Sequence, residues 1–402
     1  MQWLSRVMLK LLIENTLVKV VGMEKGYKIL GNYIRLVDER NRDLAVTKLL
    51  GVSISKKFIP SIANIVGTDL SNYKIVRTGQ FAYGPVTSRN GEKISIAYLD
   101  EEDCIISSSY TVFEVENKEE LDPEYLMLWF SRPEFDRYAR YKSHGSVREI
   151  FDWNELCMVE LPVPDIEKQR KIVKAYKTIT DRIALKQKIN DNLEATLTAT
   201  FKKMFVEDTS VEFTSQKLHE IVKTIDNRGK TPPNDSIETP YPLIEIAALR
   251  TDGRIATYRN CVKFVSEETY STWFRSGHPK QKDILMSTVG SLAELKLFWG
   301  DKGSIAQNIV AFRCYDTYMP MYLYQYLLRK QHELAAYEIG SVQASIKVSQ
   351  VVEYDIDIPP QELLIKFDKI ATTLTEKIFN NEADIDVCHR LCANLLEQLS
   401  SR

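Results

Sequence analysis

The 402-residue sequence lacks the motifs of several common enzyme classes. It has no GxxxxGK[ST] phosphate loop, no GxSxG, no HExxH and no amino-methyltransferase motif of the Asn-Pro-Pro-aromatic or Asp-Pro-Pro-Tyr type. The segment TPPN at residues 231–234 has the wrong residue order for such a motif, and no dinucleotide-type glycine loop precedes it. These absences favour a protein without catalysis of its own and leave a methyltransferase or nuclease with a divergent site as an alternative.

Neither sign of charge dominates the chain. Its 53 Lys and Arg residues against 55 Asp and Glu residues leave a net charge of -2. Because no global positive field attracts nucleic acid, any nucleic-acid face has to be a local patch.

Cysteine is scarce and scattered. The six cysteines include no CxxC pair, and no cleavable secretory leader precedes them, so we predict reduced thiols in a cytoplasmic protein. The group Cys388, His389 and Cys392 could suggest metal ligands, but both cysteines fall at apolar positions of a helical repeat. There they act as small buried residues, and we expect no metal.

Long uninterrupted apolar runs are also absent. Residues 1–22 are apolar but broken by Arg6, Lys10, Glu14 and Lys19, so they do not span a bilayer. We expect them to form an amphipathic helical extension before the first domain, either packed on the body or added from an upstream start codon. A hydrophobic share of 44% over 402 residues supports two domain cores.

One stretch of the chain occurs twice. GSVREIFDWNELCMVELPVPD at residues 145–165 aligns without a gap with GSVQASIKVSQVVEYDIDIPP at residues 340–360, offset by 195 residues. Such a repeat predicts two similar α+β (α/β-like) globular domains, at residues 23–165 and 212–360. The start of the first domain, MEKGYKILGNYI from Met23, lines up with TSQKLHEIVK from Thr214.

Proline and glycine are missing from residue 166 to residue 205. Apolar residues recur there at heptad spacing, which predicts a helix over residues 166–206, about 60 Å long at 1.5 Å per residue, with a twin over residues 361–400. Three polar residues, Lys186, Asn190 and Asn381, interrupt the apolar seam at positions that often set register. The predicted seam consists of Ile172, Tyr176, Ile179, Ile183, Leu193, Leu197, Phe367, Ala371, Leu374, Ile378, Ile385, Leu395 and Leu399.

The linker between the first long helix and the second domain has only a few residues, about 206–214. The second domain is therefore expected at the far end of the first helix. The second helix would then return along the first, giving an antiparallel two-helix coiled coil with a pseudo-two-fold repeat and a domain at either end.

Four loops combine cations with residues that can read base edges. Lys and Arg neutralise phosphates, while Arg, Asn, Gln and Ser pair with bases in the major groove. A solvated charged surface is the alternative for each loop. The candidate DNA contacts are Tyr83, Ser88, Arg89, Asn90, Lys93, Arg137, Arg140, Lys142, Asn227, Arg228, Lys230, Thr231, Arg275, His278, Lys280 and Lys282.

Two variable domains, each followed by a helical repeat after a proline pair, resemble the specificity subunit of type I DNA restriction-modification systems. The resemblance covers nearly the whole chain from Met23. It is carried by RGKTPP at residues 228–233, KDILMSTVGS at 282–291 and LPVPDIEKQRKI at 161–172. Gln169 fits the pattern in the first half, whereas its counterpart in the second half is Leu364.

The resemblance implies a subunit without catalysis, in which each domain reads one half of a bipartite double-stranded DNA target and the coil sets the gap between the halves. Two modification (methyltransferase) subunits would dock on it, and restriction (motor-nuclease) subunits would join that core. S-adenosylmethionine would bind to the modification subunits, so no cofactor is expected in this chain. The alternative from another class is a scaffold whose two domains bind proteins.

Overall fold

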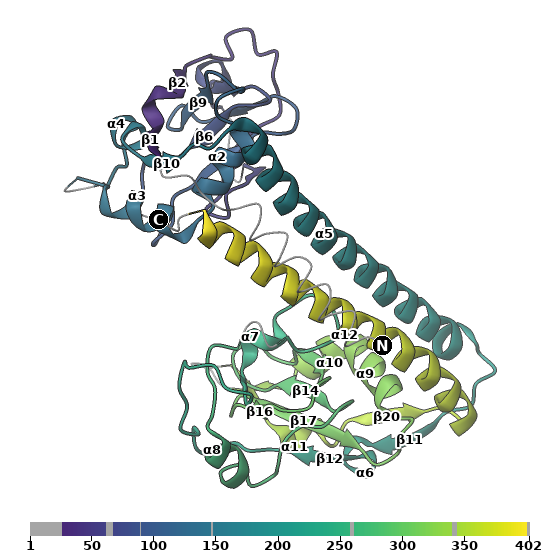
Figure 1. Ribbon diagram of the computed structural model, residues 1–402. Helices are drawn as coiled ribbons and strands as arrows, with labels where there is room; N and C mark the ends of the chain where they lie inside the picture. The colour runs from purple at the N-terminus through teal and green to yellow at the C-terminus, as the bar shows by residue number, and fades with distance from the viewer. Residues whose placement is uncertain are drawn as a thin grey trace. The chain divides into compact units, whose positions relative to one another are not determined.

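The computed structural model describes residues 26–61, 67–88, 90–145, 148–257, 261–339 and 344–399. The expected helix over residues 1–22 and the candidate contact Arg89 lie outside these ranges. Contacts divide the chain into unit 1, residues 1–182 and 388–402, and unit 2, residues 183–387. The mixture of sheets and helices within each unit confirms the α+β class (Figure 1).

Unit 1 is built on an antiparallel four-stranded sheet in the order β2-β9-β6-β7. Its centre is aromatic: the Phe81 and Phe113 rings stack at 4.9 Å, and Phe130 of α2 meets Phe81 edge-on at 6.0 Å. The strands of unit 1 are β1 (Tyr27–Ile29), β2 (Ile34–Val37), β3 (Leu50–Val52), β4 (Phe58–Pro60), β5 (Lys74–Val76), β6 (Phe81–Tyr83), β7 (Ile96–Tyr98), β8 (Cys104–Ile106), β9 (Thr111–Val115) and β10 (Glu160–Pro162).

The described part of unit 1 has three short α-helices: α2 (Pro123–Phe130), α3 (Pro133–Tyr141) and α4 (Trp153–Cys157). The Asp122 carboxylate caps α2 by accepting from the backbone N–H groups of Glu124 and Tyr125, and proline occupies the first turn, where its missing N–H costs nothing. From α2, the Tyr125 hydroxyl donates to the Pro162 carbonyl at 3.0 Å. This bond ties α2 to the strand that leads into the long helix α5.

Unit 2 repeats this plan with an antiparallel sheet in the order β12-β17-β14-β15. Residues of β14, β17, α9 and α12 share one core (Figure 1). Its strands are β11 (Thr214–Lys217), β12 (Val222–Ile225), β13 (Leu243–Ile244), β14 (Ile284–Ser287), β15 (Leu295–Leu297), β16 (Ser304–Ile305), β17 (Ile309–Cys314), β18 (Glu338–Ile339), β19 (Ser345–Ile346) and β20 (Asp355–Ile358). Its short helices are α6 (Leu218–Ile221), α7 (Ile246–Leu249), α8 (Glu267–Thr272), α9 (Pro320–Arg329), α10 (Gln331–Ala335) and α11 (Val348–Val351).

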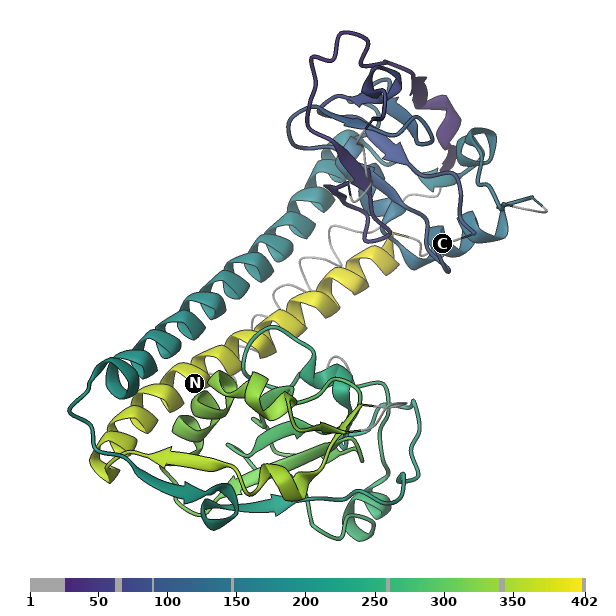
Figure 2. The same cartoon turned by 180° about the vertical axis from the view of Figure 1, so that it is seen from behind.

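The internal repeat is visible element by element at the expected offset. α4 corresponds to α11, β10 to β20, and α5 (Ile166–Lys202) to α12 (Gln361–Gln398). β1 pairs with β10 as β11 pairs with β20, and Figure 2 shows β20 leading into α12. The Tyr322 hydroxyl donates to the Asp357 carbonyl at 2.5 Å, repeating the bond that Tyr125 makes in unit 1.

The predicted alignment of the two domain starts is wrong by three residues. The backbone N–H of Leu30 donates to the carbonyl of Val159, and the backbone N–H of Leu218 donates to the carbonyl of Tyr354. Tyr354 lies 195 residues after Val159, so these two carbonyls are equivalent in the repeat. Leu30 therefore corresponds to Leu218, an offset of 188, whereas matching Met23 with Thr214 implied 191. A three-residue strand followed by one buried leucine carries too little pattern to fix the register.

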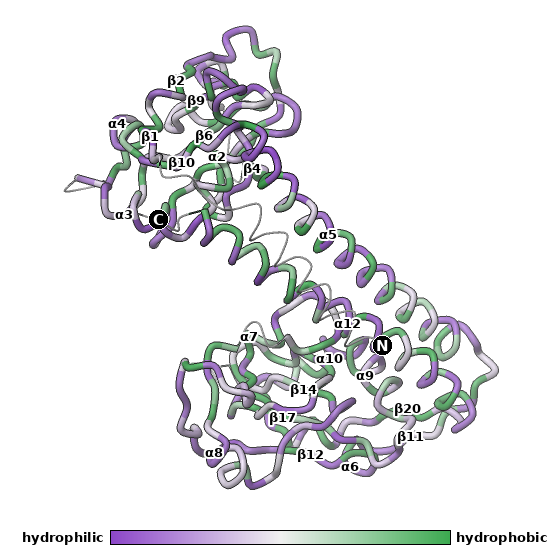
Figure 3. The backbone as a smooth tube through the Cα atoms, viewed as in Figure 1, coloured by the Kyte–Doolittle hydropathy of each residue, from purple (hydrophilic) through white to green (hydrophobic). Residues whose placement is uncertain are grey.

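The long helices show the burial that heptad spacing predicts, and polar and apolar residues alternate along both (Figure 3). All thirteen seam residues are buried or half-buried. Within unit 2 the two helices run antiparallel: the Phe201 ring lies 5.7 Å from that of Phe367, and Lys186 Nζ lies 3.1 Å from Asn381 Oδ1. α5 continues in a π-helical turn over Lys203–Glu207.

The three polar seam residues form one hydrogen-bond network. Asn381 Nδ2 donates to Asn190 Oδ1 at 2.8 Å, Asn190 Nδ2 donates to Glu382 Oε1 at 2.8 Å, and Lys186 pairs with Asp384 at 2.8 Å. Lys186 and Asn381 are themselves equivalent at the 195-residue offset. Contact between equivalent residues is what an antiparallel helix pair requires at a local two-fold axis.

Over the described ranges, no helix is long and apolar enough to cross a membrane. Cys388 and Cys392 are buried in the helix seam, as expected. Burial raises the pKa of the Cys392 thiol to about 11, which keeps it protonated at neutral pH.

Candidate nucleic-acid interface

In unit 2, hydrogen bonds join two candidate loops that are far apart in the sequence. Asn227 Nδ2 donates to the Gly277 carbonyl at 2.8 Å, and Asn227 Oδ1 accepts from the Ser276 N–H at 2.9 Å. The Ser276 hydroxyl also donates to the carbonyl of Asp226 at 2.6 Å. The loop after β12 and the loop before β14 therefore form one surface, and Gln307 of the loop between β16 and β17 joins it by donating to Thr231. We call this surface the clamp face; it consists of Lys230, Thr231, Arg275, Lys280 and Gln307.

The three cations of the clamp face are exposed: Lys230, Arg275 and Lys280. Among the described residues, none of them has a carboxylate within ion-pair distance. The Arg275 guanidinium lies over the backbone of Gly229, where an added Cβ would sit 3.6 Å from Nη2 and the φ of +127° favours glycine. These side chains are available to neutralise phosphates.

Unlike these three cations, Arg228 forms an ion pair. Its Nε and Nη2 donate to the Asp226 carboxylate at 2.9 and 2.6 Å, and its backbone N–H donates to the same group. Partial burial works to raise the pKa of Asp226, but these bonds outweigh it and lower the pKa below its ordinary value. Arg228 and Asn227 therefore shape the loop.

Two further candidates in unit 2 are held inside the domain. His278 stacks on Tyr270 at 3.7 Å, donates through Nε2 to the Tyr270 carbonyl at 2.8 Å and lies 3.2 Å from Ser304 through Nδ1. Burial lowers its pKa, so it is neutral at pH 7. Lys282 Nζ is bound to both Asp368 carboxylate oxygens, at 2.9 and 3.2 Å. Both side chains already bind partners within the domain, and their role as DNA contacts stays a prediction.

In unit 1, hydrogen bonds again join two candidate loops. The Thr87 N–H donates to the Glu149 carbonyl at 3.0 Å, Thr87 Oγ1 lies 2.9 Å from Ser143 Oγ, and the Phe151 N–H donates to the Pro85 carbonyl at 2.8 Å. Ser88 and Lys93 are exposed on this surface. Asn90 is half-buried and donates to the Val86 carbonyl at 3.3 Å.

The three other candidate cations described in unit 1 are each paired with a carboxylate. Arg137 lies 2.9 Å from Glu134, Lys142 lies 3.3 Å from Glu155, and Arg140 is paired with Glu149. Because these pairs lie at the surface, each contributes little to stability and can exchange for a phosphate.

Tyr83 is the candidate in unit 1 whose burial contradicts the prediction. Its side chain is 0% exposed and packs edge-on against Phe113 and Phe151. Burial raises the pKa of its hydroxyl well above the ordinary value. Tyr83 is a core residue, so the prediction that it touches DNA is withdrawn.

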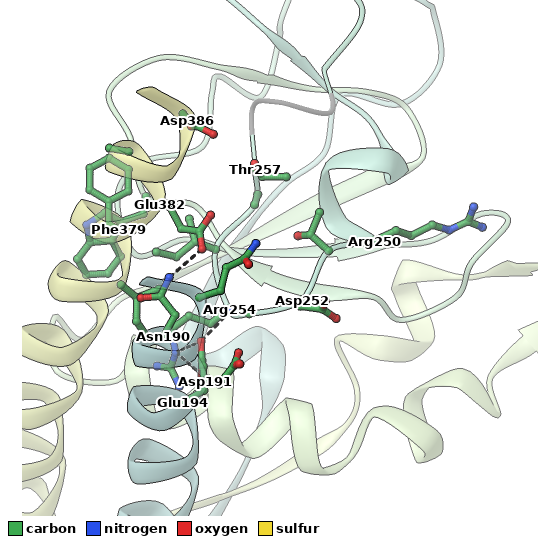
Figure 4. A pocket seen from close by; sticks show the side chains of 18 residues that line it. Asn190, Asp191, Glu194, Arg250, Asp252, Arg254, Thr257, Phe379, Glu382 and Asp386 are labelled. Carbon is green, nitrogen blue, oxygen red and sulfur yellow. Dashed lines mark hydrogen bonds and ion pairs between the residues drawn. The ribbon is translucent and has the colours of Figure 1, made fainter. Parts of the chain in front are cut away.

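A cavity of about 700 Å³ lies in unit 2, between α5, α12 and the loop at residues 250–257 (Figure 4). At its wall the buried Arg254 binds the Glu194 carboxylate at 2.9 Å and reaches Thr375 and Gln325 at 3.2 Å each. The remaining acidic residues of the lining are Asp191, Asp252, Glu382 and Asp386. This excess of carboxylates disfavours phosphate, so DNA is not expected here.

The comparisons with known proteins agree with this architecture. Residues 55–195 match the type I restriction modification DNA specificity domain. The chain is 24% identical over 307 residues to the specificity subunit of the type I restriction enzyme MjaIX of Methanocaldococcus jannaschii, covering 69% of this chain and 68% of that protein. It is 26% identical over 171 residues to the HindI specificity subunit of Haemophilus influenzae, covering 42% of this chain and 37% of that protein.

The crystal structure of the type I restriction-modification S subunit from M. genitalium matches the fold with a TM-score of 0.59 at 12% identity, over 95% of this chain and 97% of that one. The chain resembles the type I specificity-subunit family in sequence and in fold. Members of this family are non-catalytic, which agrees with the missing enzyme motifs.

Sequence reasoning missed two residues of the candidate interface. Ser276 holds the two loops of the clamp face together, and its only sequence signal is the Ser-Gly pair, which is common in turns. Gln307 is exposed between β16 and β17 and donates through Nε2 to Thr231 Oγ1. No local pattern marks it, because its partner lies 76 residues earlier.

Proposed function

We propose that this specificity subunit reads a bipartite double-stranded DNA target, one half with each unit, and directs methyltransferase and restriction subunits to it. Residues 23–165 and 212–360 would be the two target-recognition domains. The helices at 166–206 and 361–400 would be the spacer. S-adenosylmethionine would be bound by the modification subunits.

The observation that carries the proposal is the contrast between scaffold and loops in the two units. The sheets have the same strand order, and both units tie the sheet-side helix to the strand before the long helix through a tyrosine. The joined basic loops, however, differ: they follow β6 and α3 in unit 1 but β12 and α8 in unit 2. A common scaffold with different polar loops suits a protein that reads two different half-sites.

The test is methylation-sensitive sequencing of a host genome with and without this gene and its neighbouring modification gene. The expected result is a bipartite methylated motif that disappears with this chain. Unchanged methylation, together with binding of the purified complex that is insensitive to salt, would contradict the proposal and favour a protein scaffold, since phosphate contacts make affinity fall steeply with ionic strength.

A further inference from the structure

Gln307 comes from a third loop and lies among the cations of the clamp face. Its side chain is neutral and can donate and accept hydrogen bonds. It is exposed, and its amide nitrogen donates to the hydroxyl oxygen of Thr231 in the RGKTPP segment. Lys230 is the immediate chain neighbour of Thr231, and Arg275 lies over Gly229. A polar amide is therefore flanked by charges that can hold a DNA backbone.

A glutamine amide carries two N–H donors and a carbonyl acceptor. Thr231 accepts from one N–H and leaves the second N–H and Oε1 unused by this bond. The major-groove edge of adenine presents an N6 donor beside the N7 acceptor, which is the complement of that remaining pair. We propose that Gln307 reads an adenine in the half-site bound by unit 2. This inference rests on the proposed DNA-reading function.

Thr231 is a positioning residue in this arrangement. An exposed glutamine otherwise samples many rotamers, and fixing one of them on binding costs conformational entropy. The hydroxyl acceptor of Thr231 holds the amide with nitrogen toward the threonine, which fixes where donor and acceptor point. Serine at position 231 would keep this acceptor, whereas valine would keep the shape and remove it.

The flanking cations separate backbone affinity from base choice. Lys230, Arg275 and Lys280 carry charges that form no ion pair in the described part of the chain, so they would neutralise phosphates regardless of sequence. Loss of Gln307 is then expected to alter which base is preferred at one position. Loss of Lys230 is expected to weaken binding to all sequences and to reduce its salt dependence.

The experiment selects bound duplexes from a random pool, using the full chain assembled with its modification subunits. The variants are Gln307→Ala, Gln307→Glu, Thr231→Val and Thr231→Ser, with Gln216→Ala on β11 as the matched control. We expect Gln307→Ala to reduce the preference for adenine at one position of one half-site by about 10- to 100-fold, leaving the other half-site unchanged. Gln307→Glu should move that preference toward cytosine, whose N4 amine is a donor.

Thr231→Val should weaken the same preference by a smaller factor, Thr231→Ser should retain it, and Gln216→Ala should match the wild type. An unchanged base profile for Gln307→Ala, or a uniform loss over all sequences, would overturn the inference while leaving the DNA-reading function intact. Absence of any sequence preference in the wild-type complex would instead overturn the proposed function. Hydrogen exchange of each variant identifies any loss that arises from unfolding.

Discussion

Units 1 and 2 share a strand order, but residues of different type occupy equivalent packing positions in the two units. Gly79 of unit 1 and Lys282 of unit 2 are equivalent, because their N–H groups donate to the matching carbonyls of Leu99 and Phe298 at 2.7 and 2.9 Å. Gly79 has a φ of +94°, which glycine adopts freely, whereas Lys282 has a φ of +73° and binds Asp368. The fold requires a positive φ at this position, and each unit satisfies the requirement with a different residue.

The polar surfaces differ in the same way. In unit 1 the cations at residues 137, 140 and 142 are each paired with a carboxylate, while three cations of the clamp face in unit 2 have none among the described residues. These three cations of unit 2 are therefore more readily available to phosphate than the three paired cations of unit 1. Similar domains joined in one chain need not contribute equally to DNA affinity.

The largest expected effect concerns Arg254, which joins α5, α9 and α12 inside unit 2. It is 2% exposed and binds Glu194, Gln325 and Thr375. Arg254→Met leaves the Glu194 carboxylate without this partner and should lower the free energy of unfolding by about 3–5 kcal/mol. Denaturant unfolding followed by hydrogen exchange should place the loss in unit 2.

Glu194→Gln in the Arg254→Met background is the control, since it removes the remaining charge and should recover part of the loss. If hydrogen exchange showed equal destabilisation of peptides from unit 1 and unit 2, it would contradict the expectation that Arg254 stabilises unit 2 alone.

The second effect tests whether the residue pair found in unit 1 can replace the equivalent pair in unit 2. Val173 stands at the position equivalent to Asp368, so unit 1 combines glycine and valine where unit 2 combines lysine and aspartate. Lys282→Gly alone relieves a strained backbone but leaves Asp368 buried without its cation, and should cost about 2 kcal/mol.

Lys282→Gly combined with Asp368→Val should be near neutral, because both charges are then removed. The two single variants and the double variant form a thermodynamic cycle, measured by denaturant unfolding. Additive costs would show that the two residues are not coupled and would break the comparison with Gly79 and Val173.

The third effect concerns Gln169, whose side chain is 0% exposed. Its Oε1 accepts from the Asp122 N–H at 2.8 Å, and its Nε2 donates to the carbonyls of Glu120 and Pro164, both at 2.8 Å. Gln169→Leu copies Leu364, the counterpart in unit 2, but leaves these backbone groups unsatisfied. We expect a loss of about 1–3 kcal/mol.

Gln169→Glu is the shape-matched comparison, because it keeps the acceptor and loses the donor pair. Thermal unfolding of the full chain measures both variants. A neutral Gln169→Leu would mean that apolar packing suffices in unit 1 as it does around the buried Leu364.

The sequence was most informative where residues near in the chain decide the structure. The 195-residue repeat located α4, β10 and α5 with their twins, and heptad spacing identified the buried seam of both long helices. Asn381 and Asn190 could be predicted as polar seam residues because helical periodicity fixes which face they occupy.

The candidate interface was predicted less well, because the partners of its cations are distant in the chain or just outside the inspected window. Asp368 lies 86 residues after Lys282, and Glu149 follows directly after the basic segment that ends at Arg148. Tyr83 was misjudged because a strand only three residues long does not show which face is buried. Joined loops depend on tertiary contacts that no local pattern contains.

The smallest expected effect is a pH dependence that unit 2 should show through His278. Burial lowers the pKa of its imidazole in the folded state below the ordinary value of 6.5. The unfolded chain therefore takes up the proton first as the pH falls, so the contribution of the neutral ring is fully present above pH 6.5 and is lost progressively below it. His278→Gln removes this titration and should flatten the acid side of the stability profile between about pH 6.5 and pH 5. Thermal unfolding at a series of pH values measures both proteins, and parallel profiles for the wild type and His278→Gln would show that this histidine titrates alike in the folded and unfolded chains.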